Sequence, residues 1–303
     1  MNGTARIAMT QVPPEFSGRV HPDEPMSKHT SWHVGGTADL YFTPRDALDV
    51  ASFLRQLPPE VPTLWVGLGS NLLVRDGGVR GAVVSLHGAL GALDRISATR
   101  VHAEAGVACA RIARQCVKWG LGPAEFFAGI PGTLGGALAM NAGAFGGETW
   151  RHVVEVDVID RRGTRRVRTP ADYEIGYRHV RGPQDEWFLG ARLEFEHKPG
   201  GNEAAIRALL DKRKKTQPIG EWSCGSVFTN PPGKHAAQLI ESAGLKGFRV
   251  GDAAVSEKHA NFIINHGAAR AADIEALILH VQRTVADVHH VELVAEVRIV
   301  GEP

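Results

Sequence analysis

The stretch that decides the fold is EFFAGIPGTLGGALAMNAGAFGGE, which runs from Glu125 to Glu148. Its glycines alternate with small or apolar side chains, and no Lys or Arg interrupts them; they stand at positions 129, 132, 135, 136, 143, 146 and 147. Because glycine lets a backbone approach a ligand closely, this composition suits a flat, apolar slot for an aromatic ring system. A tightly packed helix crossing with small residues at the contact explains the same pattern equally well.

A second glycine-rich segment, VGLGSNLLV (66–74), follows a predicted strand. Gly67 and Gly69 allow a sharp turn, and the successive amides could cradle a phosphate, although a simple strand-connecting turn is the commoner structure. Leu72 replaces the third glycine of a GxGxxG fingerprint, and no GxxxxGK[ST] motif occurs, so neither a Rossmann unit nor a P-loop is supported. The glycine-rich segments lack clustered carboxylate, His or Cys ligands, so no metal is expected.

Composition bounds the class of protein. The chain has 303 residues, of which 43% are hydrophobic, and this length predicts two or three domains. Lys and Arg (34) nearly balance Asp and Glu (33), so no net charge favours nucleic acid or an anionic membrane as partner. Neither a signal sequence nor a membrane-spanning run of about 18 apolar residues is recognisable. Three cysteines without a CxxC motif fit reduced thiols in a cytoplasmic enzyme.

Hydrophobic periodicity predicts interleaved helices and strands. The helix over 43–58 should be capped by Thr43 and should bury Leu48. Further helices are expected at 107–120, 203–215, 233–244 and 271–288. Strands are expected at 63–67, 81–86, 100–106, 153–160, 164–169, 186–196, 259–267 and 290–302. Because the elements follow no strict repeat, an α+β fold is favoured over a doubly wound parallel sheet.

Several segments, read together, resemble one family. They are TSWHVGGTADLYFTP (30–44), VGLGSNLLV, the stretch at 125–148, YR (177–178), GSVFTNP (225–231), AAQLIESAGLKGFRVGDAAVSEKHANFIIN (236–265) and LVAEVRIVGE (293–302). In this order they resemble the UDP-N-acetylenolpyruvoylglucosamine reductases, flavoenzymes of peptidoglycan precursor synthesis. The chain is similar to the shorter class, which lacks an inserted tyrosine loop. Thr229 stands where many relatives have Lys.

The resemblance implies a fold and a cofactor. The fold is a two-subdomain FAD-binding module of the vanillyl-alcohol-oxidase (PCMH) type, followed by a C-terminal α+β substrate domain, with expected boundaries 1–90, 91–199 and 200–303. FAD is held non-covalently by two glycine loops. The implied FAD-binding residues are Gly67, Gly69, Ser70, Asn71, Leu72, Gly129, Ile130, Pro131, Gly132, Thr133, Gly135, Gly136, Asn141, Ala142 and Gly143.

The resemblance also implies a reaction. NADPH reduces FAD, and a hydride then passes to the enolpyruvyl double bond of a UDP-sugar, which yields UDP-N-acetylmuramate. Arg178 binds the substrate carboxylate, Glu296 hydrogen-bonds the developing enolate, and Ser226 donates the proton. The implied substrate contacts are Tyr177, Arg178, Asn230, Lys258, His259 and Asn261.

Local sequence alone favours ordinary roles for the same side chains. Arg178 reads as a surface arginine, Ser226 as a turn serine, and Glu296 as a strand residue paired with Arg298. The run DKRKK (211–215) reads as a solvated helix end, although it could approach a diphosphate. Two alternative functions stay open: an FAD-dependent oxidase on the same scaffold acting on another substrate, and an inactive nucleotide-binding module.

Overall fold

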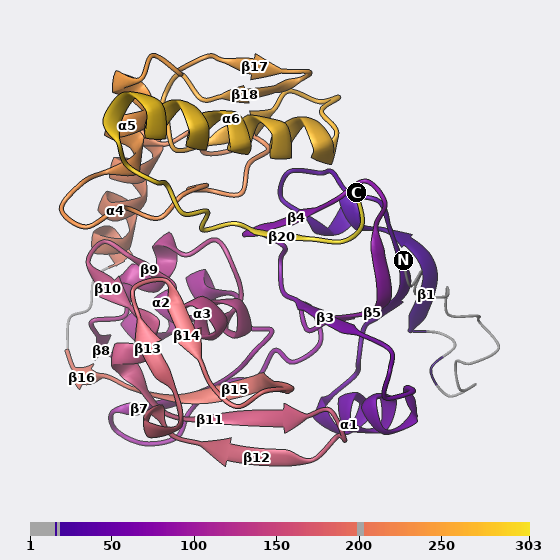
Figure 1. Ribbon diagram of the computed structural model, residues 1–303. Coiled ribbons are helices and arrows are strands. Elements are labelled where there is room, and N and C mark those ends of the chain that lie inside the picture. Colours follow the sequence, from indigo (N-terminus) through magenta and orange to yellow (C-terminus); the bar gives the residue numbers. More distant parts are fainter. Residues whose placement is uncertain (1–15, 17–18, 199–202) are drawn as a thin grey trace.

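The computed structural model describes residue 16 and residues 19–198 and 203–303 (Figure 1). The first sheet has the strand order β1-β2-β5-β3. Its strands β2 and β3 run parallel to β5, and β1 runs antiparallel to β2. Its elements are β1 (Val20–Pro25), β2 (Thr37–Phe42), β3 (Thr63–Val66) and β5 (Val79–Ser85), with α1 (Ala47–Gln56) between β2 and β3.

Helix α1 is present, but it starts differently from the prediction. The Asp46 carboxylate accepts a hydrogen bond of 2.8 Å from the N–H of Asp49 and caps the helix, so Thr43 is not the cap. Leu48 is 70% exposed, so its predicted place on the buried face is wrong. Because successive residues of an α-helix are about 100° apart, Leu48 lies on the side of α1 opposite the apolar face formed by Val50, Phe53 and Leu54.

The middle of the chain forms a five-stranded antiparallel sheet in the order β12-β11-β15-β7-β6. Helices α2 and α3 and the 3-10 helix η4 pack with it around one core, in which Cys109 and Cys116 are buried free thiols. The bounds of this part are β6 (Leu93–Arg95), β7 (Arg100–Glu104), α2 (Cys109–Lys118), β8 (Leu121–Gly122), η4 (Glu125–Gly129), α3 (Leu134–Met140), β9 (Gly143–Ala144), β10 (Gly147–Glu148), η5 (Thr149–His152), β11 (Val153–Asp160), β12 (Arg165–Arg168), η6 (Pro170–Asp172), β13 (Glu174–Gly176), β14 (His179–Arg181), β15 (Glu186–Glu194) and β16 (Glu196–His197).

The C-terminal part packs two helices on a small antiparallel sheet, shown in orange and yellow in Figure 1. Its elements are α5 (Ala236–Ser242), β17 (Arg249–Val250), β18 (Ala253–Val255), β19 (Ile263–Asn265) and α6 (Ala271–His289). Helix α4 (Glu203–Thr216) precedes them, yet its buried Ile206 belongs to the core of the middle part. No helix within the described ranges is long and apolar enough to cross a membrane.

The last strand returns to the beginning of the chain. Strand β20 (Arg298–Val300) pairs in parallel with β4 (Leu72–Val74), which follows the first glycine loop directly. The predicted strand over 290–302 is therefore too long. Before β20, this segment forms a single isolated β-bridge, between Ala295 and Phe228, and no continuous strand. The expected domain boundaries stay a prediction, and the one between 199 and 200 lies outside the described residues.

Candidate active site

A cavity of about 760 Å³ lies where the three parts of the chain meet. Its walls come from the first glycine loop (residues 67–72), the second glycine loop (residues 129–143), hairpin β13–β14, the end of α4 and the segments around Ser226 and Glu296. It collects most of the predicted site residues: Gly67, Gly69, Ser70, Asn71, Leu72, Gly129, Ile130, Pro131, Gly132, Thr133, Gly136, Ala142, Gly143, Tyr177, Arg178, Ser226, Asn230, Asn261 and Glu296.

Four predicted residues do not line this cavity, and they are Gly135, Asn141, Lys258 and His259. A Cβ at Gly135 would contact Ala105 instead. The Lys258 ammonium donates a hydrogen bond of 2.6 Å to the carbonyl of Lys214. His259 is partly buried, and this burial lowers its pKa. Thr229 also lies outside the cavity and donates its backbone N–H to the carbonyl of Val294.

The glycines of the two loops serve two different purposes. A Cβ at Gly67 would overlap Thr133, and a Cβ at Gly129 would lie 2.5 Å from Phe145 and 2.6 Å from Ala144, so both positions need glycine for the packing of the chain itself. At Gly136, in contrast, an added Cβ meets no protein atom within 4 Å. Gly136 therefore leaves open space that belongs to the cavity.

Backbone donors gather beside this open space. The N–H groups of Ser70 and Asn71 in the first loop, and of Gly132 and Thr133 in the second, donate to no acceptor among the described residues. All four residues line the cavity. Successive unpaired amides are suited to phosphate oxygens, so both loops offer donors for a nucleotide diphosphate.

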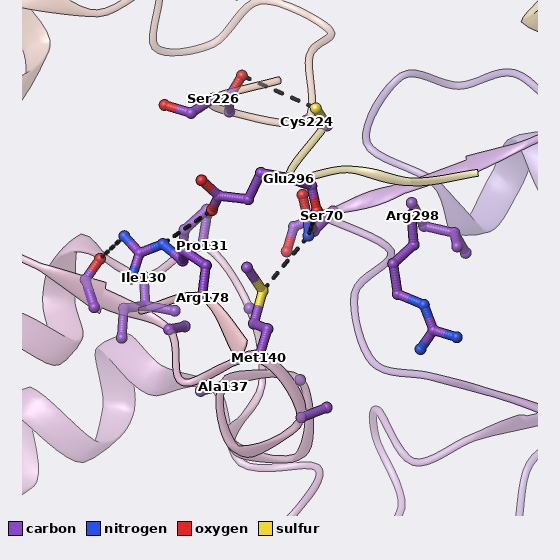
Figure 2. A pocket seen from close by; sticks show the side chains of 18 of the residues that line it. Ser70, Ile130, Pro131, Ala137, Met140, Arg178, Cys224, Ser226, Glu296 and Arg298 are labelled. Carbon is purple, nitrogen blue, oxygen red and sulfur yellow. Dashed lines mark hydrogen bonds and ion pairs between the residues drawn. The ribbon is translucent and has the colours of Figure 1, made fainter. Parts of the chain in front are cut away.

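Arg178 and Glu296 meet across the cavity although they come from distant segments (Figure 2). The Arg178 Nε lies 3.1 Å from a Glu296 carboxylate oxygen, and its Nη2 donates to the Gly143 carbonyl at 2.8 Å. The side chains are only 18% and 14% exposed. Arg178 is therefore not a surface arginine, and Glu296 pairs with it rather than with Arg298.

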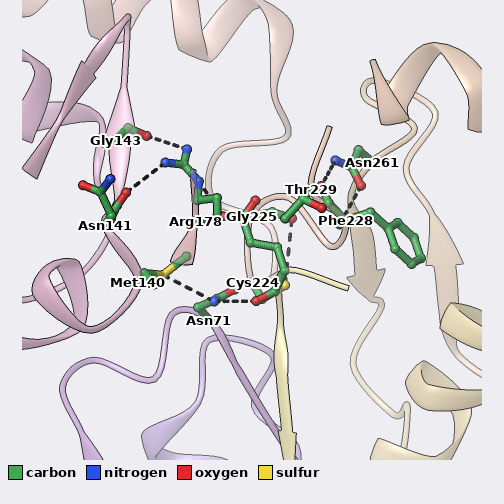
Figure 3. A network of polar contacts seen from close by, with 12 residues as sticks. Asn71, Met140, Asn141, Gly143, Arg178, Cys224, Gly225, Phe228, Thr229 and Asn261 are labelled. Carbon is green, nitrogen blue, oxygen red and sulfur yellow. Dashed lines mark hydrogen bonds and ion pairs between the residues drawn. The ribbon is translucent and has the colours of Figure 1, made fainter. Parts of the chain in front are cut away.

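The backbone around this ion pair is held by asparagines (Figure 3). Asn141 adopts a left-handed conformation (φ 48°) at the end of α3, and its carbonyl accepts from Arg178 at 3.3 Å. Asn71 donates its side-chain N–H to the Glu296 carbonyl at 2.9 Å. The first glycine loop thus fixes Glu296 directly, and the second fixes Arg178.

Ser226 lies beside Glu296 in the same cavity (Figure 2). The Val227 N–H donates to the Asn261 carbonyl at 2.9 Å, and the Glu296 N–H donates to the Val227 carbonyl at 2.8 Å. The Asn261 side chain donates to the Phe228 carbonyl at 2.8 Å and accepts from the Phe228 N–H at 3.0 Å. Asn261 therefore holds the backbone beside Ser226, whose hydroxyl bonds to none of the described residues.

Burial raises the pKa of Glu296, and the Arg178 guanidinium opposes that rise only in part. A raised pKa means that the folded state binds the proton more tightly than the unfolded state. The contribution of Glu296 to stability is then full below its unfolded pKa, near 4.5, and is lost as the pH rises through the folded value.

Replacing Glu296 with Gln should therefore remove one part of the pH dependence of stability. We expect the unfolding free energy of the wild type, relative to Glu296→Gln, to fall as the pH rises above about 4.5, by about 1.4 kcal/mol for each unit of pKa rise. Urea unfolding of both proteins over a series of pH values measures this difference. If the unfolding free energies of the two proteins differed by the same amount at every pH, Glu296 would have the same pKa in the folded and unfolded states.

The cavity also contains residues that the sequence patterns did not single out. These are chiefly Trp65, Met140, Arg213, Gln217, Cys224, Phe228 and Arg298. Burial and the nearby Glu296 raise the pKa of Cys224 well above its ordinary value, so it remains a thiol. Of the basic run at 211–215, only Arg213 reaches the cavity. Because the run consists mostly of similar basic residues, the sequence could not predict that Arg213 is the one that lines the cavity.

Comparisons with known proteins agree with this geometry. Residues 38–168 match the FAD binding domain family, and residues 217–300 match the C-terminal domain of UDP-N-acetylenolpyruvoylglucosamine reductase. The reductase of Alkalilimnicola ehrlichii is 59% identical over 288 residues, which cover 94% of this chain and 96% of the relative. The reductase of Methylococcus capsulatus is 55% identical over 282 residues, with 92% of each chain covered.

A solved structure supports the same assignment. The crystal structure of UDP-N-acetylenolpyruvylglucosamine reductase from Thermus caldophilus superimposes with a TM-score of 0.79 at 32% identity, and covers 91% of this chain and 97% of that one. These findings confirm the predicted α+β fold with a PCMH-type FAD-binding module, and an FAD-binding oxidoreductase. The chain belongs to the UDP-N-acetylenolpyruvoylglucosamine reductase family.

Proposed function

We propose that this enzyme uses NADPH and FAD to reduce the enolpyruvyl group of UDP-N-acetylglucosamine enolpyruvate to UDP-N-acetylmuramate in the cytoplasm. The proposal is carried by one observation: Arg178, Ser226 and Glu296 line a single cavity together with both glycine loops. An arginine, a hydroxyl and a carboxyl are the groups that reduction of an enolpyruvyl carboxylate requires, since charge develops on that carboxylate and a proton must follow.

The residues present fit FAD. The free amides of Ser70, Asn71, Gly132 and Thr133 would hold its diphosphate, and the open space at Gly136 would admit the cofactor close to the backbone. When bound, FAD supplies the hydride that reduces the substrate double bond. Apolar residues of the second glycine loop, such as Ile130 and Ala142, complete the wall around it.

Each polar side chain has its own task. The Arg178 guanidinium binds the substrate carboxylate and stabilises its added negative charge. The Glu296 carboxyl group, whose pKa is raised by burial, is placed to hydrogen-bond the developing enolate oxygen. The Ser226 Oγ gives its proton to the adjacent carbon, which is basic enough at that stage to accept it from an alcohol. Tyr177 and Asn230 are placed to contact the sugar nucleotide.

Replacing Gly136 with Ala should weaken FAD binding without harming the apoprotein. The new methyl group meets no protein atom within 4 Å, and alanine favours the helical conformation of α3 by up to about 1 kcal/mol. The same methyl group occupies cavity space, so we expect at least a tenfold higher FAD dissociation constant, or about 1.4 kcal/mol. Flavin fluorescence titration and thermal unfolding of the apoprotein measure both effects.

Two further alanine variants serve as controls for this prediction. Gly91→Ala adds a methyl group outside the cavity, where the nearest atom is 4.0 Å away, and should change neither quantity. Gly129→Ala should destabilise the apoprotein itself, because the new Cβ would collide with Phe145 and Ala144. An unchanged FAD affinity in Gly136→Ala would mean that the cofactor does not pass over α3.

Anaerobic stopped-flow spectroscopy tests the proposed function. The purified protein should be yellow, NADPH should bleach the flavin, and UDP-N-acetylglucosamine enolpyruvate should restore its absorbance faster than oxygen does. Rapid reoxidation by oxygen alone would instead indicate the alternative, an FAD-dependent oxidase that acts on another substrate. A preparation that stays colourless with excess FAD would contradict both.

A further inference from the structure

Arg213, near the end of α4, is a cavity-lining cation that lies outside the segment matching the FAD binding domain. Its Nη1 donates a hydrogen bond of 2.8 Å to the carbonyl of Gly129, in the second glycine loop. Its Nε donates to the Gln217 side chain at 2.7 Å. Arg213 therefore reaches into the FAD-binding domain from a different part of the chain.

The charge of Arg213 is balanced by no carboxylate in the part of the chain that the structure describes. Arg178 pairs with Glu296 and Arg75 pairs with Glu275, but no acidic group within the described ranges forms an ion pair with Arg213. Burial alone lowers its pKa. A partly buried cation without a counter-ion is costly, so negative charge that develops beside Arg213 in the cavity would be stabilised.

Another partly buried arginine, Arg161, shows that partial burial alone does not create such a site. Burial also lowers the pKa of Arg161, yet its guanidinium donates to the carbonyls of Leu54, Pro58 and Val61 and does not line the cavity. The other cations of the basic run are exposed and do not line the cavity either; these are Lys212, Lys214 and Lys215. Among these cations, Arg213 alone is both partly buried and part of the cavity wall.

The position of Gly129 indicates which part of FAD lies near this cation. Gly129 packs against Ala144 and Phe145, and the adjacent Gly143 carbonyl holds the Arg178 guanidinium. Gly129 thus belongs to the end of the cavity where the reacting groups are. The amides of Ser70 and Asn71, in the first glycine loop, remain available for the diphosphate.

We propose that Arg213 sets the reduction potential of bound FAD by placing an unbalanced positive charge beside its isoalloxazine ring. This inference rests on the proposed function only in that FAD is the cofactor. Hydride transfer from NADPH moves two electrons and one proton onto the neutral oxidised ring, which gains one negative charge while NADP⁺ forms. A fixed cation stabilises the charged, reduced ring more than the neutral one. Arg213 is a positioning residue for Gly129 as well, and the two roles are separable.

The test is the midpoint potential of FAD bound to the whole enzyme, measured anaerobically by reductive titration against a reference dye. Arg213→Gln removes the charge and, because its side chain is shorter, also the Nη1 bond to the Gly129 carbonyl. Arg213→Lys keeps the charge but also lacks that guanidinium donor. We expect Arg213→Gln to shift the ratio of reduced to oxidised FAD about tenfold toward the oxidised form, which is about 30 mV for two electrons. Arg213→Lys should stay near the wild-type value.

Lys212→Gln is the matched control, because it removes one exposed charge from the same helix and should leave the potential unchanged. Equal shifts in Arg213→Gln and Arg213→Lys would overturn the proposal and leave only support of Gly129. An unchanged potential with weaker binding of FAD or of the UDP-sugar would also overturn it, since the cation would then serve a diphosphate. Because no substrate is present in the titration, its result is independent of whether the enolpyruvyl group is reduced.

Discussion

Ser226→Ala should leave the reduction of FAD by NADPH at the wild-type rate and slow the reoxidation of FAD by UDP-N-acetylglucosamine enolpyruvate. A general acid contributes typically 100- to 10,000-fold, and we expect the second half-reaction to lose about that much. The hydroxyl lines the cavity beside Glu296 and bonds to none of the described residues, so its removal leaves no buried partner unsatisfied. Single-turnover stopped-flow measurements of each half-reaction resolve the two rates.

Ser223→Ala is the matched control for this experiment. Ser223 precedes Cys224 in the same segment but does not line the cavity, so its removal should change neither half-reaction. Equal slowing in both serine variants would indicate a distorted segment rather than a lost proton donor. Wild-type reoxidation in Ser226→Ala would assign the proton to another group.

Arg178→Ala should have the second large effect, on both catalysis and stability. Loss of a donor that stabilises developing negative charge lowers the rate about 100- to 1,000-fold, and here it should again affect only the half-reaction with the UDP-sugar. The buried Glu296 carboxylate also loses its cation, so its pKa should rise further and the unfolding free energy at neutral pH should fall by about 3 kcal/mol. Stopped-flow kinetics and urea unfolding measure the two effects.

The double variant Arg178→Ala/Glu296→Gln separates these effects. It should regain much of the lost stability, because a neutral side chain no longer needs a cation, but it should remain slow. Arg181→Ala, in the same hairpin but outside the cavity, should behave as the wild type. A stability loss that persists in the double variant would mean that the bonds from Arg178 to Asn141 and Gly143 matter more than the ion pair.

The glycine pattern predicted where a ligand would approach, but it did not predict which glycines face it. All of them look alike in the sequence, yet Gly129 and Gly67 are required by contacts with Phe145 and Thr133, whereas Gly136 faces open space. The contact between Gly67 and Thr133 joins segments that are distant in the chain, and the contact between Gly129 and Phe145 depends on how the second loop folds back on itself, so local composition cannot reveal either. The same reason explains why local pattern paired Glu296 with its strand neighbour Arg298.

The sequence by itself determined the α+β class, most helices and strands, and the family, because periodicity, turn glycines and ordered motifs are local properties of the chain. The roles proposed for the three polar residues came from the family resemblance and not from their local sequence. Only the tertiary structure decided that Glu296 pairs with Arg178 and that Arg213 reaches the cavity without a counter-ion among the described residues. Side-chain partners, burial and the resulting pKa depend on packing between segments more than 80 residues apart, such as Arg213 and Gly129. Such contacts form only when β20 returns to β4 and α4 packs on the middle core.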